Sequence, residues 1–148
     1  MLFRSRAILE EKLTEGREAP CVELEELARS GRDAEFLEAV GRRFLEKHEQ
    51  DSTFMRLLLF SALEGHELSE MFSAEMAARD PLAEFFKKKM TEGAFRPLDP
   101  HLVARLFIGM FVNYIQGQEI LGLKRHRTFD RDEVVRAFVS IFLSGIKL

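Results

Sequence analysis

The residues that could support catalysis or metal binding are few and scattered along this chain. Four histidines are the main candidates for binding a metal or moving a proton: His48, His66, His101 and His126. A helical di-iron site needs a glutamate three residues before a histidine on facing helices. A leucine stands at that position before each of the four. Each histidine also lies near a helix end or in a link, so we interpret all four as solvent-exposed and expect no metal and no cofactor.

The common catalytic motifs are also missing. The 148 residues contain no glycine-rich phosphate loop, no G-x-S-x-G nucleophile elbow and no pair of cysteines. The single cysteine, Cys21, excludes an internal disulfide and favours a reducing cytoplasm. These observations predict a protein that is not an enzyme.

Charge and hydropathy exclude two further classes. No window approaches 18 uninterrupted apolar residues, so we expect no membrane-spanning helix and no membrane partner. The net charge is −3, and the densest basic run, Lys87 to Lys89, spreads around a turn of helix. Duplex DNA binding needs a concentrated basic face, so we expect this chain alone not to bind DNA.

The aromatic residues point to a thick core, an apolar cavity, or both. Phenylalanine occurs 14 times, against one tyrosine and no tryptophan. Phenylalanine provides a large rigid apolar surface without a polar group. Strict alternation of apolar and polar residues, which is the pattern of a strand with one buried face, is absent. We therefore expect helices to carry the phenylalanine side chains into the interior.

The hydrophobic spacing predicts helices almost throughout the chain. We expect them at about residues 5–15, 22–31, 34–49, 51–64, 66–93, 100–122 and 130–144. Asp33, Asp99 and Asp130 stand where N-caps belong, and Pro100 suits the first turn of a helix. Pro81 lies inside the fifth pattern and predicts a kink or a break near Asp80.

The segment "LFIGMFVNYIQG", residues 106–117, is apolar on nearly every side. On a helical wheel, one side carries Val103, Phe107, Phe111, Tyr114 and Gln118, and the opposite side carries Leu102, Leu106, Gly109, Asn113, Gly117 and Ile120. Helices of this kind are buried. One interpretation is that a partner subunit covers the second side, with the glycines permitting close approach. The alternative is a central helix in which the glycines are incidental.

The stretch "ALEGHELSEMFSAEM…EGAFRPLDPHLVARLFIGMFVNYI" resembles the C-terminal domain of the tetracycline-repressor (TetR) family of bacterial transcriptional regulators. "FRSRAIL" near the start resembles the segment that follows the family's DNA-recognition helix. The resemblance implies an all-α bundle of about 6–7 helices whose last two helices form a four-helix bundle with a symmetry mate. It also implies that residues 1–17 are the remnant of a connecting helix after a helix-turn-helix missing from this sequence, through which DNA would be bound. Residues 18–148 would bind an effector and dimerise.

The resemblance, combined with the helical spacing, yields two sets of candidate residues. We expect an apolar or aromatic small molecule to be lined by Phe44, Phe54, Leu58, Phe72, Met76, Phe86, Phe107, Phe111, Tyr114 and Gln118. The alternative for each of these residues is plain packing in the core. We expect the homodimer interface near Leu106, Gly109, Asn113, Gly117, Phe138 and Phe142. The leading function is a ligand-sensing, dimerising regulatory domain of a repressor; the alternative is a helical interaction module that heterodimerises with full-length regulators.

Overall fold

The computed structural model describes residues 7, 8, 11, 22–65, 67–78 and 80–148, without the side chains of Leu68, Glu75, Met76 and Ala78. These residues form seven α-helices: α2 (Val22–Arg29), α3 (Asp33–Gln50), α4 (Thr53–Leu63), α5 (Glu67–Ala78), α6 (Pro81–Thr91), α7 (Pro100–Ile115) and α8 (Arg131–Ile146). A π-turn (Gln116–Ile120) extends α7, and a short 3-10 turn (Leu123–Arg125) follows it. The predicted all-α class is confirmed. Most of the helix expected at residues 5–15 lies outside the described residues.

Aspartate caps fix three helix starts. The Asp80 carboxylate accepts a hydrogen bond from the Ala83 backbone N–H, which separates α6 from α5 at the point where Pro81 predicts a break. Asp99 accepts from two backbone N–H groups at the start of α7. Asp130 accepts from the Glu133 N–H at the start of α8. Each carboxylate satisfies donors that a helix cannot pair internally.

The predicted cap at Asp33 is wrong. Asp33 is the first residue of α3 rather than its cap, and its carboxylate lies 2.9 Å from the ammonium group of Lys89 on α6. Both side chains are largely buried. A buried charge needs an opposite charge nearby. The ion pair between Asp33 and Lys89 therefore holds the start of α3 against the end of α6.

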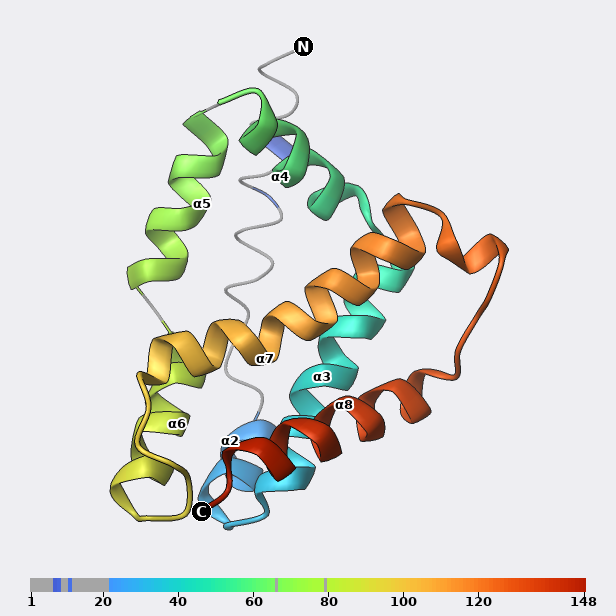
Figure 1. The fold of residues 1–148 in the computed structure, drawn as a ribbon. Coiled ribbons are helices and arrows are strands. Elements are labelled where there is room, and N and C mark those ends of the chain that lie inside the picture. Colours follow the sequence, from blue (N-terminus) through green and yellow to red (C-terminus); the bar gives the residue numbers. More distant parts are fainter. Residues whose placement is uncertain (1–6, 9–10, 12–21, 66, 79) are drawn as a thin grey trace.

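Helix α3 is the central support. It packs against α2, α7 and α8, while α6 packs against α7 and α4 packs against α5. Figure 1 shows α7 (orange) and α8 (red) running alongside each other with α3 passing behind them. Helices α4 and α5 lie at the end of the molecule opposite α8 (Figure 1).

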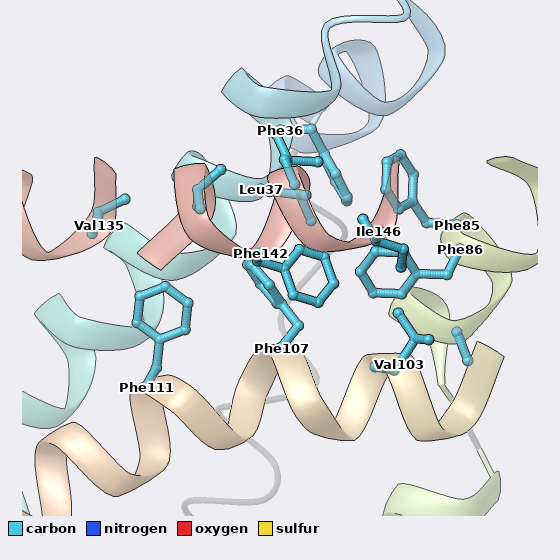
Figure 2. Packing of buried hydrophobic residues seen from close by; sticks show 14 of the residues in the cluster. Phe36, Leu37, Phe85, Phe86, Val103, Phe107, Phe111, Val135, Phe142 and Ile146 are labelled. Carbon is cyan, nitrogen blue, oxygen red and sulfur yellow. The ribbon is translucent and has the colours of Figure 1, made fainter. Parts of the chain in front are cut away.

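The core lies between α3, α6, α7 and α8. Phe86, Phe107 and Phe111 are fully buried there, and Phe142 of α8 is 6% exposed. Figure 2 shows these rings pointing toward one another from three helices. The Phe107 ring centroid lies 5.1 Å from that of Phe142 and 5.3 Å from that of Phe111, which are edge-to-face distances favoured by aromatic quadrupoles.

Close approach of α3 and α7 depends on Gly41. A Cβ atom added to Gly41 would lie 2.4 Å from Cζ of Phe111. The Phe111 ring therefore rests directly on the α3 backbone, and only glycine leaves space for it at this position.

Candidate functional site

The ten candidate ligand-lining residues separate into three groups in the structure. Phe86, Phe107 and Phe111 belong to the packed core described above. Their rings contact one another and α8, with centroids of Phe86 and Phe107 6.3 Å apart. These three side chains are surrounded by other side chains of the same domain and form its interior.

A second group lies where α3, α4 and α5 meet. Phe44, Phe54 and Phe72 are half-buried, and the ring centroids of Phe54 and Phe72 are 5.6 Å apart. His48 lies between Phe44 and Phe54, with ring centroids 4.4 Å and 6.3 Å away. Leu58 is half-buried one turn along α4 from Phe54, whereas the Met76 side chain lies outside the described residues. We name Phe44, His48, Phe54 and Phe72 the aromatic row.

The third group, Tyr114 and Gln118, lies at the end of α7. The buried Gln118 amide donates to the backbone carbonyl of Arg127, at 3.2 Å. The Tyr114 ring packs edge-on against Phe129 and Phe138, with centroids 6.3 Å and 6.0 Å away. The Gln118 amide therefore holds the loop between α7 and α8.

His48 differs from its predicted solvent exposure. Its side chain is buried, with 6% exposed, and its Nδ1 atom has no hydrogen-bond partner in the described structure. Burial lowers the pKa of His48 below its ordinary value and the charge of Lys47 lowers it further, while Asp51 opposes both. The imidazole is thus uncharged near pH 7. The signal was present in the sequence, since His48 follows Phe44 by four residues on the inward stripe of α3.

The other histidines are more exposed or undescribed. His101 and His126 are exposed, and the His101 ring lies 3.1 Å from the Asp80 carboxylate. His66 and Cys21 lie outside the described residues. Within the described ranges, no group of three or more His, Cys, Asp or Glu side chains is placed to hold a metal ion.

A second buried polar group lies on the inward face of α4. Ser61 is 4% exposed and its Oγ atom lacks a hydrogen-bond partner among the described atoms. Ser61 follows Phe54 by seven residues, which places both on one face of the helix. Buried polar groups without partners are uncommon and identify places where a ligand or water would complete the hydrogen bonding.

A hollow of about 350 Å³ opens beside the aromatic row, at the junction of α3 and α4. It is lined by Arg43, Glu46, Lys47, His48, Gln50, Asp51 and Phe54. This volume lies within the range of small-molecule sites. The combination of an open volume, the rings of Phe54 and His48 and the unpartnered His48 Nδ1 atom makes this end of the domain the candidate binding site.

Comparison with known families agrees with this architecture. Residues 35–145 match the model of the C-terminal domain of AefR-like transcriptional repressors, a TetR-type domain. The chain belongs to the TetR family. No match was found among curated proteins, and none among solved structures.

The candidate interface residues of this TetR-family domain also divide. On α7, Leu106 is 60% exposed, and Gly109 and Asn113 are exposed beside it. Phe138 is half-buried against Phe111 and Tyr114, and Phe142 belongs to the core, where it packs on Phe86 and Phe107. Gly117 is half-buried, and a Cβ atom there would lie 3.2 Å from the Leu123 side chain.

The face of α7 directed away from the core is apolar and uncovered within the described structure. Leu102 is 65% exposed beside Leu106, and Ile141 on the neighbouring α8 is 70% exposed. These three residues, with Gly109 and Asn113, define what we name the α7–α8 face. None of the described helices is long and apolar enough to cross a membrane.

Proposed function

We propose that the chain is the small-molecule-sensing, dimerising regulatory domain of a TetR-family transcriptional repressor, with an apolar or aromatic effector. The observation that carries the proposal is the aromatic row, where the half-buried Phe54 and the buried His48 line an open hollow and the His48 Nδ1 atom lacks a hydrogen-bond partner in the described structure. Family membership supports a regulatory role, because C-terminal domains of this family typically dimerise and bind effectors. The effector would contact α3, α4 and α5, with Leu58 and Met76 as further wall residues.

The α7–α8 face supports dimerisation. A two-fold axis would bring Leu106 and Gly109 of one protomer against the same residues of the other, which is the isologous arrangement of most homodimers. Three exposed large apolar side chains, Leu102, Leu106 and Ile141, would then be buried. Phe142 lies in the core of its own chain and supports this surface from behind.

A direct contact connects the ligand region with the dimer region. Arg56 on α4 donates from its guanidinium to the backbone carbonyl of Glu119 in the π-turn that extends α7. π-Turns of this kind are frequent at functional sites. An effector that favours one position of α4 would favour one arrangement of the end of α7, and its influence is limited by its differential affinity for the two arrangements.

Sedimentation and thermal-shift measurements test the two parts separately. The full chain is expected to sediment as a dimer at micromolar concentration, and Leu106→Glu is expected to make it monomeric. Leu63→Glu is the matched control, because Leu63 is 86% exposed on α4, away from the α7–α8 face. A wild-type monomer would contradict the dimer proposal.

For the effector, aromatic compounds are screened for a concentration-dependent rise in melting temperature, as mass action requires for a ligand of the folded state. Phe54→Ala is expected to abolish the rise, whereas the exposed control Phe60→Ala is expected to retain it. If no aromatic compound stabilises the chain, the sensing role is wrong. The alternative interaction module shares the dimer result and differs in giving no ligand response.

A further inference from the structure

The hollow between α3 and α4 has a charge distribution that aromatic walls alone do not explain. Arg43 and Lys47 lie four residues apart on α3 and therefore project from one face. Within the described part of the chain, neither side chain has an ion pair or hydrogen bond. Both are exposed at the rim of the hollow.

The acidic groups of the same hollow are engaged elsewhere. Glu46 lies 3.2 Å from the guanidinium of Arg131 on α8. The Asp51 carboxylate accepts from the backbone N–H of Thr53 at 2.9 Å, as part of the turn into α4. Both carboxylates of the lining interact with other groups, so the two cations at the rim remain available to pair with an anion.

The floor of the hollow is aromatic. Phe54 supplies one ring and the buried His48 imidazole a second, with their centroids 6.3 Å apart. The unpartnered Nδ1 atom of His48 can donate to, or accept from, a ligand. Among the described residues of the lining, His48 is the one buried polar residue, and it lies next to Phe54, whereas Arg43 and Lys47 are exposed at the rim.

Building on the proposed function, we propose that this hollow binds a small aromatic carboxylate, with its ring against Phe54 and His48 and its carboxylate held by Arg43 and Lys47. Arginine binds carboxylates through paired N–H groups, and such charge-assisted hydrogen bonds are about twice as strong as neutral ones. A neutral aromatic compound would use the ring surface and leave both cations without a partner. The charged groups facing His48 here are Lys47 and Asp51, and a bound carboxylate adds a negative charge that favours the imidazolium form.

Two probes of nearly equal shape test the proposal: 2-naphthoate, which is anionic, and 2-naphthamide, which is neutral. Binding of each to the full chain is measured by calorimetry at low salt, because exposed charges are screened at high ionic strength. We expect 2-naphthoate to bind at least about tenfold more tightly. Arg43→Gln and Lys47→Gln are each expected to weaken 2-naphthoate by about threefold to tenfold and to leave 2-naphthamide unchanged.

Lys87→Gln is the matched control, since it removes an exposed positive charge from α6, outside the hollow. It is expected to change neither affinity. The affinity for 2-naphthoate is also expected to rise as the pH falls from 8 to 6, and His48→Gln is expected to flatten this rise. Arg43 and Lys47 are exposed, so their variants keep the test valid if the His48 variant does not fold.

Equal affinity for the two probes, or insensitivity of 2-naphthoate to both rim substitutions, would overturn the carboxylate proposal. Such a result would leave the broader sensing role intact if 2-naphthamide still binds. Binding of neither probe also overturns the carboxylate proposal. The sensing role is then decided independently by the wider aromatic screen.

Discussion

Two regions of this domain are rich in phenylalanine, and the phenylalanine side chains have a different role in each. In the core between α6, α7 and α8, the rings of Phe86, Phe107 and Phe111 are fully buried and contact one another. In the aromatic row, Phe54 and Phe72 are half-buried, and Phe54 borders an open hollow. Residue type therefore does not separate core from site.

Rings from different helices meet in both regions, and the two differ in how deeply the rings are buried and in the polar groups beside them. Every core phenylalanine meets rings from at least one other helix, which fills the space between the helices (Figure 2). The row instead contains His48, whose Nδ1 is unpartnered in the described structure, and Ser61 on α4 likewise has an unpartnered Oγ there. Stability is concentrated in the first region, while the second keeps unsatisfied groups of the kind that functional sites retain at a cost in stability.

The sharpest test of this contrast compares Phe107→Ala with Phe54→Ala. Phe107 is fully buried, so its truncation is expected to lower the free energy of unfolding by about 3–5 kcal/mol through lost burial and a new cavity. Phe54 is half-buried, and its truncation is expected to cost about 1–2 kcal/mol. Urea unfolding monitored by circular dichroism measures both. Equal costs would mean that the row is packed as tightly as the core.

A second comparison uses glycines. Gly41→Ala is expected to destabilise the domain by about 1–3 kcal/mol, because the added Cβ would overlap the Phe111 ring. Gly109 has nothing within 4 Å of an added Cβ, so Gly109→Ala is expected to stabilise α7 by about 0.5–1 kcal/mol through helix propensity.

Both glycine variants are measured in the Leu106→Glu background, so that changes in dimerisation do not enter the unfolding free energy. A harmless Gly41→Ala would show that the Phe111 ring can move aside. The contact between α3 and α7 would then be looser than the structure indicates.

Short stretches of sequence were enough to predict most of the helix boundaries, but fewer features of the candidate site. Asp99 before Pro100 and Asp130 before Glu133 begin helices for reasons contained in a few neighbouring residues, so they could be predicted. Pro81 likewise placed the break between α5 and α6. Asp33 could not be assigned, because its partner Lys89 is distant in sequence and a buried ion pair outcompeted the cap.

The candidate site shows the same limit. Helical spacing places Phe54 and Phe107 on inward stripes alike, but it does not tell which stripe meets filled space. His48 was predicted to be exposed because it lies near a helix end, although its spacing of four residues from Phe44 places it on the inward stripe of α3, where Phe54 of α4 packs nearby. Whether an inward stripe meets the filled core or the open hollow depends on how the helices pack against one another in three dimensions. The spacing of residues along one helix does not contain this information.

A smaller effect is expected at Ser61. Its buried hydroxyl lacks a partner in the described structure, so Ser61→Ala removes a desolvated polar group and is expected to stabilise the fold by up to about 1 kcal/mol. Ser144→Ala on α8 is the control, because the exposed Ser144 hydroxyl donates to the Ser140 carbonyl. A clear loss of stability in Ser61→Ala would show that the hydroxyl is satisfied, and it would weaken the comparison of the two regions.

The smallest expected effect is the pH dependence contributed by His48. Burial, with the charge of Lys47, lowers the pKa of the folded imidazole below its ordinary value of 6.5. Above that pH the group is neutral in both states and contributes nothing. As the pH falls through 6.5, the unfolded chain takes up the proton first, so the free energy of unfolding decreases until the folded imidazole is protonated too. His48→Gln is expected to reduce the slope of stability against pH between pH 7 and 5, whereas His126→Gln, at an exposed position, serves as the control.

Urea titrations of the wild type and the two variants at matched pH values give this slope directly. A His48→Gln slope equal to that of the wild type would mean that the imidazole is as well solvated as an exposed one, and the aromatic row would then lose its buried polar group.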